Sequence, residues 1–183
     1  MSEMYSTLEQ VVTPVIQVNV TKADGATFDG DVIYLDADDE LKEIAKYIKM
    51  NSTHNADVNP GRIKFFYTTE TKKDAGKFVA GQLLVRNGIE KMINDDYDYI
   101  VLVHYKGWKE LDMEHKVMQL DKILCGVKIT SDDKVKKQSI DSKEYISNLR
   151  HFGSDKVLQS TEIVDMAIER IVEEEKEQKR QNG

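Results

Sequence analysis

The feature that most constrains this chain is an apolar run followed by a helical pattern, within residues 98–130. The run YIVLV at 99–103 has no polar interruption, which is typical of a strand covered on both faces. After a break at Gly107, Asp112 is placed to cap an amphipathic helix, and Gly126 is expected to end it in a left-handed conformation. The apolar positions of that helix are Met113, Val117, Leu120 and Leu124. We therefore expect the fold to be organised around one buried strand and the helix that follows it.

The rest of the chain alternates between strand and helix patterns. Residues 15–35 predict a β-hairpin, because alternating apolar segments flank Asp24-Gly25, a pair that favours tight turns. Residues 78–93 fit either a strand or a short helix. The other expected elements are a helix capped by Asp36 or Asp38 and ending near Asn51, a strand at 62–69, a short strand at 127–130, a polar loop at 131–139, a helix capped by Asp141 or Ser142 and closed by Gly153, and a helix at about 157–180.

Length and composition predict one domain, residues 1–183, of the α+β class. We expect a small, mostly antiparallel sheet of about four or five strands with packed helices, and an amphipathic helix at the C-terminus. With 40% hydrophobic residues and no long apolar run, no membrane span is expected. A single cysteine excludes an intramolecular disulfide, so the expected location is the cytoplasm.

Residues that commonly hold metals do not cluster locally along the chain. The histidines are interpreted as surface or turn residues: His54, His104, His115 and His151. Cys125 is interpreted as a small buried side chain, because no basic cluster beside it would lower its pKa. From the residues alone, no metal or cofactor is expected.

The order of features from the central strand onward resembles the putative phage metallopeptidase family, a zincin-like group. The matching residues are Trp108, Leu111, Glu114, Leu120, Asp121, Leu124 and Cys125, followed by Asp141, Glu144, Tyr145, Phe152 and Gly153. The resemblance covers about residues 40–153 and leaves the hairpin at 15–35 and the last helix unexplained. It implies a zincin-like core with a helix that carries two histidines one turn apart and a glutamate.

This chain departs from the family pattern at the three positions that carry the chemistry. Lys122 and Gly126 stand where the resemblance places the two histidines, and Ile123 stands where it places the glutamate. An ammonium group repels Zn²⁺, isoleucine cannot accept a proton, and glycine offers no ligand atom. The departure predicts a pseudoenzyme: a metallopeptidase-like scaffold with no catalytic residues, no metal and no cofactor.

A scaffold of that kind is expected to act by binding another protein, either of the host or of the phage. The resemblance implies a phage-encoded protein in the host cell cytoplasm, with inhibition of a host or defence factor as its role. The expected interaction surface combines the hairpin and the last helix through Phe28, Val32, Tyr34, Ile163, Ile168 and Ile171. The last helix could instead pair with a second copy of the chain, as a homodimer.

Two other functions stay open from the sequence. One is an active zinc metallopeptidase with a rearranged site, in which folding brings His104, His115 or His151 together. The other is a nucleic-acid-associated accessory protein that uses one of two lysine clusters, Lys128, Lys134, Lys136 and Lys137 or Lys72, Lys73 and Lys77. The net charge of −7 argues against nucleic acid as a partner, because phosphate binding needs clustered positive charge.

Overall fold

The computed structural model describes residues 34–86, 97–129, 135–139 and 145–181. Its centre is a four-stranded sheet in the order β1-β2-β6-β5. These strands are β1 (Tyr34–Asp36), β2 (Ile63–Thr68), β5 (Gly81–Val85) and β6 (Tyr99–His104). The inner pair, β2 and β6, is parallel, and both outer pairings are antiparallel. The α+β class is confirmed, with a mixed sheet.

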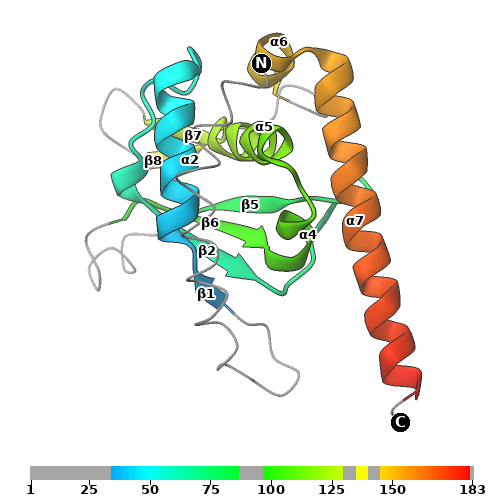
Figure 1. Ribbon diagram of the computed structural model, residues 1–183. Coiled ribbons are helices and arrows are strands. Elements are labelled where there is room, and N and C mark those ends of the chain that lie inside the picture. Colours follow the sequence, from blue (N-terminus) through cyan, green and yellow to red (C-terminus); the bar gives the residue numbers. More distant parts are fainter. Residues whose placement is uncertain (1–33, 87–96, 130–134, 140–144, 182–183) are drawn as a thin grey trace.

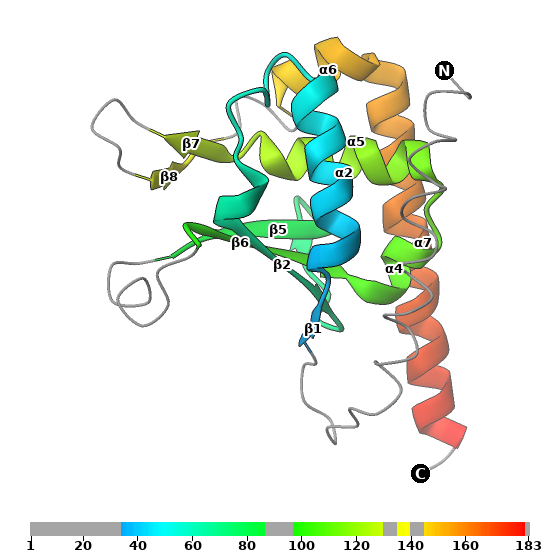
Figure 2. The same cartoon turned by 60° about the vertical axis from the view of Figure 1, so that its left-hand side comes forward.

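Helices cover the sheet, and two small ladders lie beside it (Figures 1 and 2). The helices are α2 (Asp38–Asn51), α4 (Tyr105–Lys109), α5 (Met113–Leu124), α6 (Ile146–Phe152) and α7 (Ser154–Gln181), with one 3₁₀ turn, η1 (Pro60–Arg62). The ladders pair β3 (Lys73–Asp74) with β4 (Lys77–Phe78), and β7 (Val127–Ile129) with β8 (Val135–Lys137). Figure 2 shows α2 and α5 stacked on one face of the sheet.

The predicted central unit is confirmed. Every residue of β6 except Ile100 is buried. Asp112 caps α5, and its carboxylate accepts a hydrogen bond of 2.8 Å from the backbone N–H of His115. All four apolar residues expected on the inner face of α5 are buried. This unit fixes the direction of α5 relative to the sheet.

Several element boundaries differ from the sequence-based expectation. Gly126 is not in the left-handed region; among the described glycines, Gly76 and Gly153 have positive φ. A side chain at position 126 would instead collide with its neighbours, since a Cβ there would lie 2.9 Å from Leu83 Cδ2. The N-cap of α2 is Ala37, with no side-chain cap, and α6 begins after Tyr145. The polar segment after residue 131 contains a strand, β8.

Residues 78–93, whose pattern fits either a strand or a short helix, contain strand β5 in the part that the structure describes. Strand β5 begins at Gly81. A glycine is required there because a Cβ at that position would lie 2.3 Å from the carbonyl oxygen of Leu102 on β6. The outer half of β5 exposes Leu84 and Val85, which explains the weak alternation in the sequence. The predicted hairpin at 15–35 lies outside the described residues, except for the first two residues of β1.

The long helix α7 docks on its own chain. Val157, Val164, Ile168 and Ile171 are buried, and Ile168 packs so closely that a Cβ on Gly107 of α4 would lie 2.6 Å from its Cγ1. The C-terminal end of α7 is charged, exposed and extends past the sheet (Figure 1). Among the described residues, no helix has the length and hydropathy needed to span a membrane.

We expect Ile168→Ala to lower the free energy of unfolding by about 2–5 kcal/mol, the usual cost of truncating a fully buried aliphatic side chain. Met166→Ala is the matched control on the same helix, because Met166 is 70% exposed, and its effect should stay within about 0.5 kcal/mol. Urea denaturation at two protein concentrations measures both. A small effect of Ile168→Ala, or a midpoint that depends on concentration, would show that α7 packs differently in solution.

Candidate metal centre

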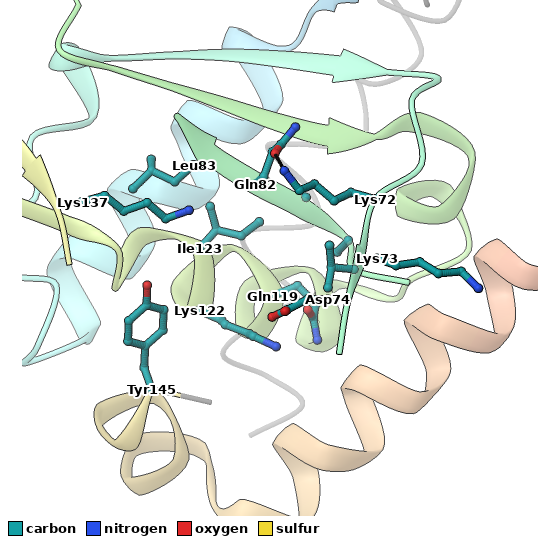
Figure 3. Close-up of a pocket in the computed structure, with 13 residues that line it drawn as sticks. Lys72, Lys73, Asp74, Gln82, Leu83, Gln119, Lys122, Ile123, Lys137 and Tyr145 are labelled. Atoms are coloured by element: carbon teal, nitrogen blue, oxygen red, sulfur yellow. Dashed lines mark hydrogen bonds between the residues drawn. The ribbon is translucent and has the colours of Figure 1, made fainter. Parts of the chain in front are cut away.

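The three positions singled out in the sequence lie on the side of α5 that faces β5. Lys122 and Ile123 line a pocket between α5 and the sheet, and Gly126 follows the helix end (Figure 3). Beyond Leu83, a Cβ on Gly126 would also lie 3.2 Å from the hydroxyl oxygen of Tyr145. A histidine at 126 would therefore have no room. Residues at these positions supply neither imidazole nor carboxylate, so they do not fit a zinc ion.

The buried side of α5 carries a different group of residues, centred on Asp121. The Asp121 side chain is fully buried. One of its carboxylate oxygens accepts hydrogen bonds of 2.8 Å from His54 Nε2 and 2.8 Å from Asn148 Nδ2, and the other accepts one of 3.0 Å from Asn55 Nδ2. Three donors from two other segments of the chain therefore surround one carboxylate.

Local structure brings His54 and Asn55 to α5. Ser52 is the C-cap of helix α2, and its N–H donates to the carbonyl of Ile48. The Ser52 hydroxyl lies 3.0 Å from His54 Nδ1. The carbonyl of Asn55 accepts a hydrogen bond of 3.1 Å from the N–H of Val58. Pro60 then opens the 3₁₀ turn η1, which leads into β2. This folded loop holds the imidazole against the helix instead of leaving it in solvent.

Cys125 is the third member of the cluster. It is the C-cap of α5, one turn after Asp121, and its thiol lies 3.8 Å from Asn55 Nδ2 and 3.6 Å from the Ser147 hydroxyl. Ligand atoms of His54, Asp121 and Cys125 all lie within 4.8 Å of one another. Among the described residues, this is the group of His, Cys, Asp and Glu side chains close enough to share a metal ion.

The electrostatics of the cluster are those of a buried ion pair. Burial alone would raise the pKa of the Asp121 carboxyl, but the hydrogen bond and charge of His54, with the two amide donors, lower it. Burial alone would lower the pKa of the His54 imidazole, but Asp121, together with Cys125, raises it to about 10. Without a metal, the site therefore holds a proton on His54.

Chemically, the cluster fits zinc. Imidazole nitrogen, carboxylate oxygen and thiolate sulfur are the donors that bind Zn²⁺ in proteins. The His54 side chain is 15% exposed, whereas the other two are buried, so the cluster meets solvent at His54. His151 stands at that rim, exposed, with its ring centroid 5.5 Å from that of His54 in an edge-on contact.

The other two histidines have separate local roles. His104 caps α4, its Nδ1 accepting a hydrogen bond of 3.1 Å from the N–H of Gly107, and burial lowers its pKa. His115 pairs with Asp112 at 2.6 Å in the first turn of α5. Folding thus selects His54, which the sequence interpretation assigned to the surface, and places His104 and His115 elsewhere.

The residues expected to form an interaction surface are spread over different environments. Tyr34 is 53% exposed on the edge strand β1, whereas Ile168 and Ile171 are buried within their own chain. Ile163 is partly buried and packs against the core. Phe28 and Val32 lie outside the described residues. In this structure the isoleucines stabilise the docking of α7 and do not form an open surface.

Comparison with known proteins identifies one family. A family model described as putative phage metallopeptidase matches residues 33–174, well over half of the chain. The match confirms the resemblance and extends it on both sides, to β1 and into most of α7. Neither the curated proteins nor the solved structures give a match.

The prediction that the chain is not an enzyme is wrong. It rested on Lys122, Ile123 and Gly126, which occupy one side of α5 only. The matched family is described as putative phage metallopeptidase, and His54, Asp121 and Cys125 form a potential metal-binding cluster on the other side of the helix. The expectation that no metal is bound stays a prediction, because losing ligands at one set of positions does not exclude ligands at another.

We expect Asn148→Ala to lower the free energy of unfolding by about 1–3 kcal/mol, because it removes one of three donors from a buried carboxylate. Asn51→Ala is the control: the Asn51 amide also makes a hydrogen bond, to the carbonyl of Tyr47, but at an exposed helix end. Its replacement should cost less than about 1 kcal/mol. Urea denaturation of metal-free protein compares them, and equal effects would contradict the central role of Asp121.

Proposed function

The chain belongs to the putative phage metallopeptidase family, and on this premise we propose that it is a zinc-dependent peptidase with a rearranged metal site. The proposed ligands are His54, Asp121 and Cys125. The observation that carries the proposal is their convergence from a loop and a helix end, with all three ligand atoms within 4.8 Å of one another.

The number and type of donors support a catalytic site over a purely structural one. Structural zinc sites use four protein ligands, whereas catalytic sites use three and leave a position for water or substrate. Hydrogen bonds from Asn55 and Asn148 to Asp121 hold the carboxylate in place, as groups around zinc ligands commonly do. When bound, zinc supplies an activated water and polarises a peptide carbonyl.

The buried side-chain oxygen of Asn148, beside the cluster, also supports the presence of a hydrogen-bond donor such as water at this site. Asn148 donates to Asp121 through Nδ2, but its Oδ1 is buried and has no hydrogen-bond partner among the described residues. An unsatisfied buried acceptor costs about 1–3 kcal/mol, and a donor such as water would remove that cost.

His151 is the proposed proton acceptor. It lies at the exposed rim, in contact with His54, and an imidazole is the side chain most often used for proton transfer near neutral pH. His54 and Asp121 would be engaged as ligands, so proton transfer has to come from a neighbouring group. A substrate peptide would approach from this rim, where the cluster meets solvent.

We expect purified protein to contain close to one zinc ion per chain, measured by elemental analysis after gel filtration. Asp121→Asn and Cys125→Ser should lose most of it, because each removes a charged ligand. His115→Gln is the control, since His115 lies outside the cluster. Substitution with cobalt(II) should give a thiolate-to-cobalt charge-transfer absorption that Cys125→Ser abolishes. Full zinc content in both ligand variants would refute the assigned site.

We expect the zinc-loaded protein to cleave members of a quenched-fluorescent peptide library, with activity lost to a chelator and restored by zinc. His151→Gln should lower kcat by about 10²–10⁴-fold, the usual contribution of general acid–base catalysis, with zinc content unchanged. Circular dichroism checks that the variant folds. Stoichiometric zinc without cleavage, or cleavage that survives chelation, would refute the peptidase assignment while leaving the metal measurement intact.

A further inference from the structure

A second site lies on the opposite side of α5 from the metal cluster. A pocket of about 280 Å³ opens between α5, β5 and the two small ladders. Its walls combine apolar residues, Val79, Ala80, Leu83 and Ile123, with the polar side chains of Gln82, Gln119 and Tyr145. The proposed zinc ligands Asp121 and Cys125 are not among its lining residues. The helix itself therefore separates the pocket from the metal cluster.

The charge of the pocket is opposite to that of the whole chain. Among the described lining residues there are four lysines, Lys72, Lys73, Lys122 and Lys137, and one carboxylate, Asp74, although the chain carries a net charge of −7. These lysines come from three separate segments: the β3 region, α5 and β8. Positive side chains from separate segments thus meet at one pocket, where they can attract an anion.

Figure 3 shows how the lysines are oriented. Lys72, Lys122 and Lys137 lie around Gln82, Ile123 and Gln119, whereas Lys73 points away toward α7. The Lys72 ammonium donates a hydrogen bond of 2.6 Å to Gln82 Oε1, at the wall of the pocket. The Lys73 ammonium lies 4.2 Å from the centre of the Phe78 ring. The three lysines, one from each segment, therefore border the pocket at separate points.

We propose that this pocket binds a phosphate-bearing small molecule, whose negative charge is balanced by Lys72, Lys122 and Lys137. A carboxylate carries one charge, whereas a phosphate ester carries about −1.5 to −2 near neutral pH and presents three acceptor oxygens. Lysine binds phosphate as a compact point charge.

The rest of the pocket suits an uncharged part of the same ligand. Leu83 and Ile123 offer an apolar surface, and the hydroxyl of Tyr145 and the amide of Gln119 can form hydrogen bonds. A volume of about 280 Å³ is at the lower end for small-molecule sites. The ligand class is therefore a small phosphorylated compound, such as a nucleotide or a phosphorylated metabolite. A polymer would need a longer groove.

The test is calorimetric titration of the full chain with three probes: inorganic pyrophosphate, ATP and an acidic peptide of glutamates. We expect both phosphate probes to bind, with affinity that falls as salt concentration rises. Lys122→Gln and Lys137→Gln should each weaken ATP binding about tenfold or more, because each removes a hydrogen bond from a charged donor. Lys122→Arg should retain most of the affinity.

Lys49→Gln is the matched control, because it makes the same change of charge on an exposed residue of α2 outside the pocket. Its affinity for ATP should equal that of the unchanged protein. The proposal is overturned if neither phosphate probe binds with millimolar affinity or better at low salt, if only the glutamate peptide binds, or if all lysine variants lose affinity equally. Zinc content is measured on the same samples, so the outcome is separate from that of the metal site.

Discussion

A central constraint on the fold is the buried carboxylate of Asp121. A charge removed from water costs several kcal/mol unless hydrogen bonds and an opposite charge replace the solvent. Here His54, Asn55 and Asn148 provide both, from the loop after α2 and from α6. The same contacts that satisfy the carboxylate therefore position the loop and α6 on α5. Removing the charged partner, here His54, from such an ion pair typically costs about 3–5 kcal/mol, because the remaining charge stays buried.

The same arrangement also affects how a metal ion could bind, because it favours a proton on His54. In the metal-free protein, a proton on His54 neutralises Asp121, and the pKa of His54 is correspondingly high, about 10. A metal ion bound by His54 would have to displace that proton. The ion pair stabilises the metal-free fold, and the same proton would compete with a metal for His54 at neutral pH.

Local patterns in the sequence predict the central strand and helix, but not the cluster. The buried run at 99–103, the cap at Asp112 and the helical spacing after it are local signals. Asp121 and Cys125 are four residues apart, so their shared side of α5 was visible in the sequence. His54 lies 67 residues before Asp121, and its position depends on how α2 ends and how η1 turns the chain toward β2. Gly126 shows the same limit. Glycine is needed there because Leu83, on β5, leaves no room for a side chain, and this contact is not visible in the local sequence.

Helix α5 separates the proposed metal cluster from the pocket, so the two sites suit ligands of opposite charge. Successive residues on a helix are rotated by about 100°, so Asp121 and Lys122 face different surroundings although they are neighbours in sequence. Asp121 faces the protein interior, where amide donors hold a negative charge that attracts a cation. Lys122 faces the pocket beside β5, where other lysines make the environment favourable for anions. The position that the family resemblance assigned to zinc is thus electrostatically unsuited to a cation, and the residue before it is well suited to one.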